Sequence, residues 1–137
     1  MAGEPRRLYA AVAAGSALGA LARYLCSVAA VALLGPAFPW GTLTVNVLGS
    51  FLIGLYASLS EPDGRLLASP AQRQFVMAGF CGGFTTFSIF SLETLLLVDR
   101  QEFDLAAIHV TVSVALWLAS VWIGYRIGSK MNRLKRS

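Results

Sequence analysis

Four apolar runs, separated by short polar stretches, set the pattern of hydrophobic and polar positions along the chain. They cover residues 8–34, 40–59, 75–98 and 105–128. Each run has the roughly 20 residues that a helix needs to cross a bilayer. The pattern therefore predicts four transmembrane helices, with both chain ends and the loop of residues 61–74 on the same side of the membrane.

The third apolar run has an unusual centre. Residues 79–91 read GFCGGFTTFSIFS, with three glycines, two adjacent threonines and two serines, a composition that disfavours an uninterrupted helix. Unwound backbone survives at membrane depth only where protein or a water-filled path surrounds it. Broken helices of this kind hold the ion sites of many transporters. The sequence predicts a third helix broken at its centre and a chain that binds or moves a small ion.

The composition leaves little room for any other domain. The chain has 137 residues, of which 56% are hydrophobic and 13% charged, and its mean hydropathy is +0.65. We expect a single four-helix transmembrane unit over residues 1–137. One histidine, two cysteines within the spans and a lone membrane carboxylate do not assemble a nucleophile and base, so no enzyme is expected. The basic C-terminal tail lacks interleaved aromatic residues, which argues against nucleic-acid binding.

Polar residues also interrupt the first two runs. On the second, Thr42, Asn46 and Ser50 lie at helical spacing on a face of small residues. Asn46 alone would suit an interhelical hydrogen bond, but beside the interrupted third run it is a candidate for lining an ion path. On the first, Gly15 and Gly19 form a small-residue pair that lets helix backbones approach closely, and they share a face with Arg23. Arg23 either snorkels to the interface, or it forms a buried structural ion pair or a link to the pore vestibule.

The last two runs add aromatic and titratable candidates. Phe87 and Phe90 are three residues apart, and their ring edges, which carry partial positive charge, suit an anion. Glu93 in the same run needs a donor partner or an aqueous edge. In the fourth run His109 and Ser113 are four residues apart and share a face.

Taken together, these segments resemble the Fluc (CrcB-type) fluoride channels over essentially the whole chain. The matching pieces are residues 19–24 (GALARY), 41–51 (GTLTVNVLGSF) and 79–91, followed by Glu93. The resemblance implies an all-α membrane protein that forms an antiparallel dual-topology dimer with two fluoride pores. The chain departs from the family's usual Thr-Phe-Ser-Thr-Phe motif at Ile89, which replaces the second threonine and so lacks its hydroxyl.

The same resemblance implies roles for particular residues. Main-chain carbonyls of Gly82 and Thr85 would hold a structural sodium ion that is not transported, and Arg23 and Glu93 would be structural. The residues implied to line the pore or contact fluoride are Asn46, Thr86, Phe87, Ser88, Phe90, Thr94, His109 and Ser113. For His109 and Ser113 the match rests on spacing alone.

We therefore expect a fluoride-selective channel subunit, a multi-pass protein of the bacterial plasma membrane. It would export fluoride passively, lower cytoplasmic fluoride, and have membrane lipid and a second Fluc-type subunit as partners. The alternative is a small dual-topology proton-coupled exporter. Such a carrier would want an acidic residue in the first span, where this chain has Arg23.

The distribution of basic residues bears on the second subunit. The side with both chain ends holds nine of the eleven Lys and Arg residues: Arg6, Arg7, Arg65, Arg73, Arg126, Lys130, Arg133, Lys135 and Arg136. The positive-inside rule then predicts insertion mainly with both ends in the cytoplasm. A chain that must insert both ways should be nearly unbiased. The default expectation is a homodimer, and the charge bias makes a pair with an oppositely oriented homologue the alternative.

Overall fold

The chain is built entirely of helices in a computed structural model that describes residues 3–136, with side chains for residues 4–133. The first two spans are α1 (Gly3–Leu34) and α2 (Trp40–Leu59), and the last is α6 (Phe103–Arg136). The third span, Pro70–Asp99, is made of several shorter helices. Within the described residues, four helices are long and apolar enough to cross a membrane, which confirms the four predicted spans.

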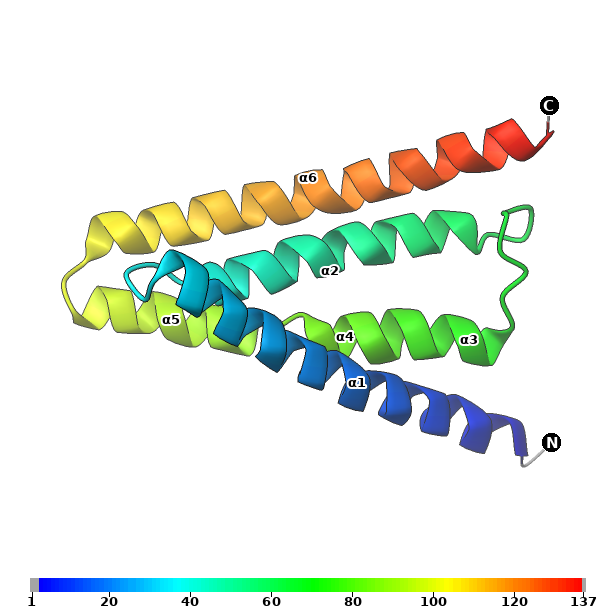
Figure 1. The fold of residues 1–137 in the computed structure, drawn as a ribbon, viewed down its shortest axis with the longest axis horizontal. Helices are drawn as coiled ribbons and strands as arrows, with labels where there is room; N and C mark the ends of the chain where they lie inside the picture. Colours follow the sequence, from blue (N-terminus) through cyan, green and yellow to red (C-terminus); the bar gives the residue numbers. More distant parts are fainter. Residues whose placement is uncertain (1–2, 137) are drawn as a thin grey trace.

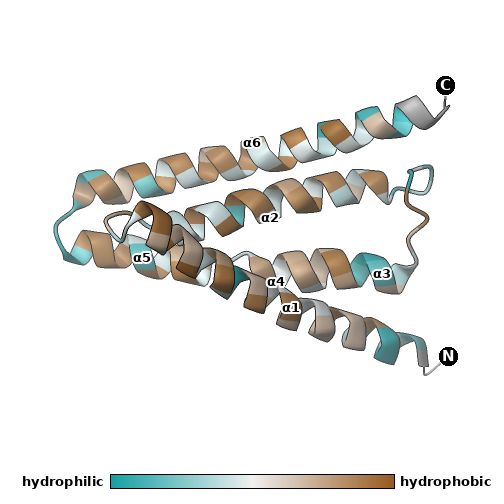
Figure 2. Cartoon of the chain, in the orientation of Figure 1, coloured by the Kyte–Doolittle hydropathy of each residue, from teal (hydrophilic) through white to brown (hydrophobic). Residues whose placement is uncertain are grey.

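Both ends of the chain lie at one end of the bundle (Figure 1). The connection between α2 and the third span lies at that same end, and the other two connections lie opposite, as the four-span pattern predicts. Apolar residues cover the middle of the helices, whereas hydrophilic residues gather toward the two ends (Figure 2). This distribution is the one that a bilayer around the middle of the bundle requires.

Local sequence explains where several helices begin and end. Gly35, with a positive φ of 81°, ends α1. The third span starts at Pro70 behind a capping box, in which Ser69 and Gln72 satisfy each other's backbone N–H groups. The predicted limits of the fourth span, 105–128, are too short because polar residues continue α6 as a helix to Arg136.

Glycines bring the helices into backbone contact. A Cβ atom at Gly19 would collide with the carbonyl oxygen of Phe80, and one at Gly83 with the carbonyl oxygen of Ser16. The α2–α6 contact is built in the same way around Gly54 and Gly124. The small-residue pairs of the sequence therefore mark true helix crossings, as such pairs do in membranes.

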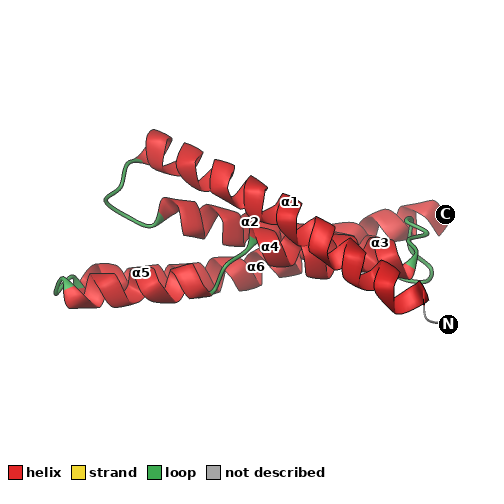
Figure 3. Ribbon diagram, turned by 90° about the horizontal axis from the view of Figure 1, so that it is seen from below, coloured by secondary structure: helices red, strands yellow, loops and turns green. Residues whose placement is uncertain are grey.

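The third span changes its helical form three times. It begins as α3 (Pro70–Gln74), widens into the π-helix η1 (Phe75–Cys81), and closes with α4 (Gly82–Phe84). Residues 85–87 then leave the helix, with Thr85 in an extended conformation (φ −86°, ψ 161°), before α5 (Ser88–Asp99) begins. Beyond this interruption α5 runs beside α6 and diverges from α1 and α2 (Figures 1 and 3).

Candidate functional site

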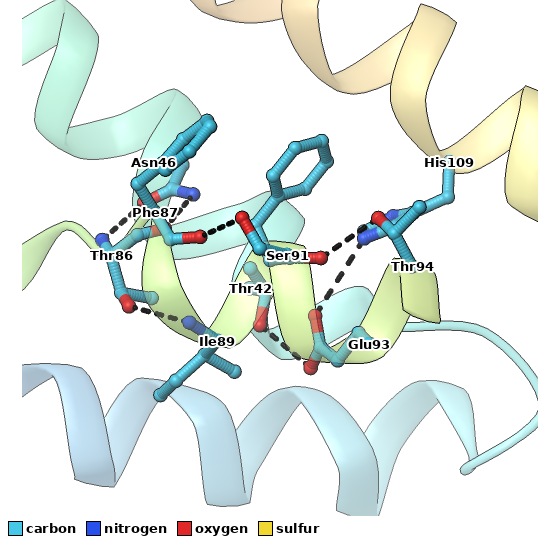
Figure 4. A network of polar contacts seen from close by, with 10 residues as sticks. Thr42, Asn46, Thr86, Phe87, Ile89, Ser91, Glu93, Thr94 and His109 are labelled. Carbon is cyan, nitrogen blue, oxygen red and sulfur yellow. Dashed lines mark hydrogen bonds and ion pairs between the residues drawn. The ribbon is translucent and has the colours of Figure 1, made fainter. Parts of the chain in front are cut away.

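The side chain of Asn46 holds the interruption of the third span from α2. Its Nδ2 donates to the carbonyl oxygen of Thr86 at 2.8 Å, and its Oδ1 accepts from the Thr86 N–H at 2.7 Å (Figure 4). Asn46 is 5% exposed. In an uninterrupted helix the Thr86 N–H would donate to the carbonyl of Gly82. The Asn46 side chain therefore takes the place of the helical acceptor of the Thr86 N–H, which is the hydrogen-bonding role considered for Asn46. Its second N–H remains for another acceptor.

The hydroxyl of Thr86 replaces the helical acceptor of Ile89 in the same way. The Ile89 N–H donates to Thr86 Oγ1 at 3.2 Å, whereas a continuous helix would direct it to the Thr85 carbonyl. Gly82 and Thr85 thus both lose the donor four residues ahead, and they are the residues whose carbonyls the family resemblance implies as ligands of a sodium ion. The Ser88 hydroxyl lies 3.4 Å from the same Thr86 oxygen.

Arg23 reaches this interruption from α1. Its half-buried guanidinium donates to the Thr85 carbonyl oxygen at 3.4 Å. Within residues 4–133, whose side chains the structure describes, Arg23 has no carboxylate partner. Arg23 thus contacts the interrupted third span through a main-chain carbonyl rather than through an ion pair.

Glu93 joins α5 to two other helices. Its Oε1 accepts from the hydroxyl of Thr42 at 2.8 Å, and its Oε2 lies 3.7 Å from Nε2 of His109 on α6 (Figure 4). The second distance is too long for a hydrogen bond. The predicted need of Glu93 for a donor is therefore met by Thr42.

Polar atoms without a partner form a row along α6. His109 and Ser113 are fully buried, and neither ring nitrogen of His109 nor the Ser113 hydroxyl has a hydrogen-bond partner among the described residues. One turn further, the same holds for Nε1 of Trp117. Buried polar atoms are nearly always paired in folded proteins. The row is therefore a candidate contact for water or an ion.

The ring of Phe90 lies against this row. Its centroid is 4.8 Å from that of His109 and 4.8 Å from that of Trp117. Phe90 is 6% exposed, whereas Phe87, whose ring lies 5.6 Å away, is 70% exposed on the surface of the single chain. The sequence interpretation missed Trp117, although its four-residue step from Ser113 was a usable signal.

The remaining predicted site residues differ in their surroundings. Ser88 is exposed at the start of α5. The Thr94 hydroxyl donates to the carbonyl of Phe90 at 2.8 Å, within its own helix. The structure thus brings Asn46, Thr86 and Phe90 together with the α6 row, and leaves Ser88 at the edge of that group.

Two hollows meet at Thr86. One of about 760 Å³ lies between the α1–α2 loop and α5, and its lining includes Thr42, Glu93 and Arg100. The other, of about 290 Å³, is lined in part by Asn46, Phe87 and Trp117, beside Gly82 and Thr85. Thr86 lines both. The chain therefore has open space on each side of the residue that Asn46 holds.

Comparison with known proteins places this chain in a family. Residues 10–125 match the family described as CrcB-like protein, Camphor Resistance (CrcB). The chain belongs to this family. A relative from Rhodopseudomonas palustris, named fluoride-specific ion channel FluC 1, is 56% identical over 128 residues, which are 93% of this chain and 91% of the relative.

Two further relatives match over a similar share of this chain. The protein of the same name from Bradyrhizobium diazoefficiens is 55% identical over 130 residues, 95% of this chain and 90% of the relative. The fluoride-specific ion channel FluC of Opitutus terrae is 46% identical over 130 residues, 95% and 98% of the two chains. The resemblance found in the sequence is therefore confirmed at the level of the family.

Proposed function

We propose that this chain is a subunit of a fluoride-selective channel that lets fluoride leave the cell passively. The names of the relatives support this substrate. The observation that carries the proposal is the row of buried, unpartnered polar atoms on α6 beside Phe90. Buried polar atoms that have no partner in the chain are free to hydrogen-bond an ion, and Trp117 at the end of the row also lines the smaller hollow.

The chemistry of the row suits a small, strongly hydrated anion. A selective pore must replace the water around fluoride with donors, and imidazole, hydroxyl and indole groups are such donors. The edges of Phe87 and Phe90 add partial positive charge without a fixed cation that would trap the ion. In this proposal fluoride enters the larger hollow, passes Thr86 and Phe90, and continues past Ser113 and Trp117.

Residues around this path would hold its shape. Asn46 fixes Thr86 and still has one N–H to offer an anion. Glu93, bound by Thr42, would position α5 against α2 and lie beside His109. Ser88 and Thr94 are supporting members at most, since Ser88 is at the surface and the Thr94 hydroxyl is already engaged.

A structural sodium ion fits the interruption of the third span. Gly82 and Thr85 are among the residues whose carbonyls lose their helical donors, because the Thr86 N–H donates to Asn46 and the Ile89 N–H donates to Thr86 Oγ1. Main-chain oxygens freed in this way are the ligands that broken membrane helices offer to sodium. We propose that these two carbonyls hold the ion, which would add a positive centre near the anion path. Arg23 already donates to the Thr85 carbonyl and would share it.

A second subunit would complete the channel. Phe87 is 70% exposed although an aromatic lining residue should be enclosed, which supports an antiparallel partner packed over the interruption. We take a homodimer as the default assembly. The excess of basic residues at the end with both termini favours one orientation and keeps a heterodimer with an oppositely inserted homologue as the competing assembly.

The bacterial plasma membrane is the proposed location, supported by the four spans and by the bacterial relatives. A proton-coupled exporter is not favoured. Such a carrier needs an acidic residue in its first span, and here that helix places Arg23 on the Thr85 carbonyl.

Ion flux from liposomes that contain only the purified chain tests the proposal. We expect fluoride to leave only when a potassium ionophore balances its charge, at a rate that an imposed pH gradient does not change. Chloride should remain inside over the same period. Fluoride efflux that stops when protons are equilibrated across the membrane would instead establish the exporter.

A further inference from the structure

A stripe of basic residues follows the C-terminal end of α6, outside the path described above. Arg126, Lys130 and Arg133 lie three to four residues apart, are exposed, and line one shallow hollow together with Ile127. Trp122 lies four residues before Arg126, on the same face of α6, and begins the stripe. We name Trp122, Arg126, Lys130 and Arg133 the basic stripe.

The basic stripe has an oriented guanidinium and no carboxylate partner among the side chains described. The guanidinium carbon of Arg126 lies 5.3 Å from the ring centroid of Trp122, which orients the charge by a cation–π contact. Among the side chains described for residues 4–133, no carboxylate pairs with Arg126, Lys130 or Arg133. Glu61 lies nearby, but its Oε1 accepts from the hydroxyl of Tyr125.

The length of α6 places the basic stripe at the membrane surface. Its 34 residues extend over about 51 Å, whereas the hydrocarbon core is about 30 Å thick. A core that starts near Leu105 therefore ends near Tyr125. Trp122, which is 61% exposed, then lies in the aromatic belt, and Arg126 and Lys130 lie at the depth of the phosphate groups.

We propose that the basic stripe binds the phosphate headgroup of an anionic phospholipid in the leaflet at the end of the bundle with both termini. Arg126 and Lys130 contact the phosphate, Trp122 and Ile127 cover the start of the acyl chains, and Arg133 adds charge from the aqueous side. This binding is independent of the ion that the path carries. Lys135 and Arg136 are part of the same tail, but their side chains lie outside the described residues.

Native mass spectrometry of the full-length chain tests this site with phosphatidylglycerol as the probe and phosphatidylcholine as its zwitterionic counterpart. The test variant is Arg126→Gln/Lys130→Gln/Arg133→Gln. The matched control, Arg6→Gln/Arg7→Gln/Arg100→Gln, removes the same number of exposed charges elsewhere. Each charge removed from the basic stripe should weaken phosphatidylglycerol binding about fivefold. The control should bind as the wild type does.

Three results would overturn the proposal. The first is equal binding of phosphatidylcholine and phosphatidylglycerol to the wild type. The second is equal loss in test and control variants, which would show a general effect of net charge. The third is displacement of the lipid by millimolar inorganic phosphate, which would show a free-phosphate site. Trp122→Leu sharpens the test because it keeps every charge and should still weaken binding by removing the cation–π contact.

Discussion

The two halves of the third span meet their neighbours in opposite ways. Before the interruption, the packing half (residues 70–84) contacts α1 backbone to backbone at Gly79 and Gly83. After it, the path half (residues 88–99) meets α6 through the ring of Phe90 and leaves polar atoms unpaired. The packing half therefore fixes where the span lies, whereas the path half leaves buried polar atoms that a ligand can pair.

Each half also contains a pair of phenylalanines. The rings of Phe80 and Phe84 are stacked, with centroids 5.7 Å apart and an interplanar angle of 12°. The rings of Phe87 and Phe90 are 5.6 Å apart but tilted by 42°. Only the second pair adjoins the row on α6. Residue type and spacing are thus nearly matched between the halves, and their surroundings differ.

The largest effect is expected where the two halves join. Asn46→Leu removes both hydrogen bonds to Thr86 and leaves two buried backbone groups unpaired, at about 1–3 kcal/mol each. We expect a marked loss of thermal stability in detergent and loss of fluoride efflux. Asn46→Asp keeps the acceptor for the Thr86 N–H and should recover part of the stability without recovering efflux. Normal conduction by Asn46→Leu would show that the assigned path is wrong.

Two adjacent glycines test the packing half. A Cβ atom at Gly83 would collide with the backbone of Ser16, whereas one at Gly82 has nothing within 4 Å. Gly83→Ala should therefore lower the free energy of unfolding by about 1–3 kcal/mol, as overpacking does. Gly82→Ala should leave it nearly unchanged. Thermal unfolding in detergent compares the two, and equal melting temperatures would contradict the close helix crossing.

A smaller effect is expected from one hydroxyl in the row. Ser113→Ala removes a buried polar atom that has no partner in the chain, so stability should hold or rise slightly. Fluoride efflux should fall by about tenfold, equivalent to about 1.4 kcal/mol, if that hydroxyl contacts the ion. Ser91→Ala is the control, since its hydroxyl already donates to the Phe87 carbonyl. Equal rates for both variants would remove Ser113 from the path.

The smallest effect is expected at the proposed sodium site. Thr85→Val deletes the hydroxyl that donates to Cys81 but keeps the Thr85 carbonyl. If main-chain oxygens hold the ion, fluoride efflux should change by less than about twofold, because the variant loses only one local, part-buried hydrogen bond, which contributes about 1 kcal/mol to stability. Crystals grown with a heavier monovalent cation should show anomalous density beside Gly82 and Thr85. Water at that place would remove the metal from the proposal.

Much of the fold followed from the sequence because its causes are local. Run length and hydropathy predicted four spans, and small residues four apart, such as Gly15 and Gly19, predicted where backbones meet. The third span begins at Pro70, five residues before its apolar run, because a capping box starts the helix there. The length of α6 did not follow from its apolar run, because a helix continues into water wherever polar residues still favour it.

The site was only partly predictable because its geometry depends on packing. Asn46 and Phe90 were identified by type and spacing, but the double hydrogen bond between Asn46 and Thr86 joins residues 40 positions apart. No periodicity reveals such a contact. Trp117 was missed because a tryptophan in a span usually packs or anchors, and its unpaired Nε1 becomes evident only once α5 lies against α6.

Fluoride efflux from liposomes, compared between Phe90→Ile and Phe80→Ile, tests the division of the third span most directly. The two variants make the same chemical change in the two halves. We expect Phe90→Ile to lower the efflux rate at least tenfold, while Phe80→Ile stays within about twofold of the wild type when both are equally folded. Equal rates for the two variants, or a larger loss for Phe80→Ile, would contradict a path between α5 and α6.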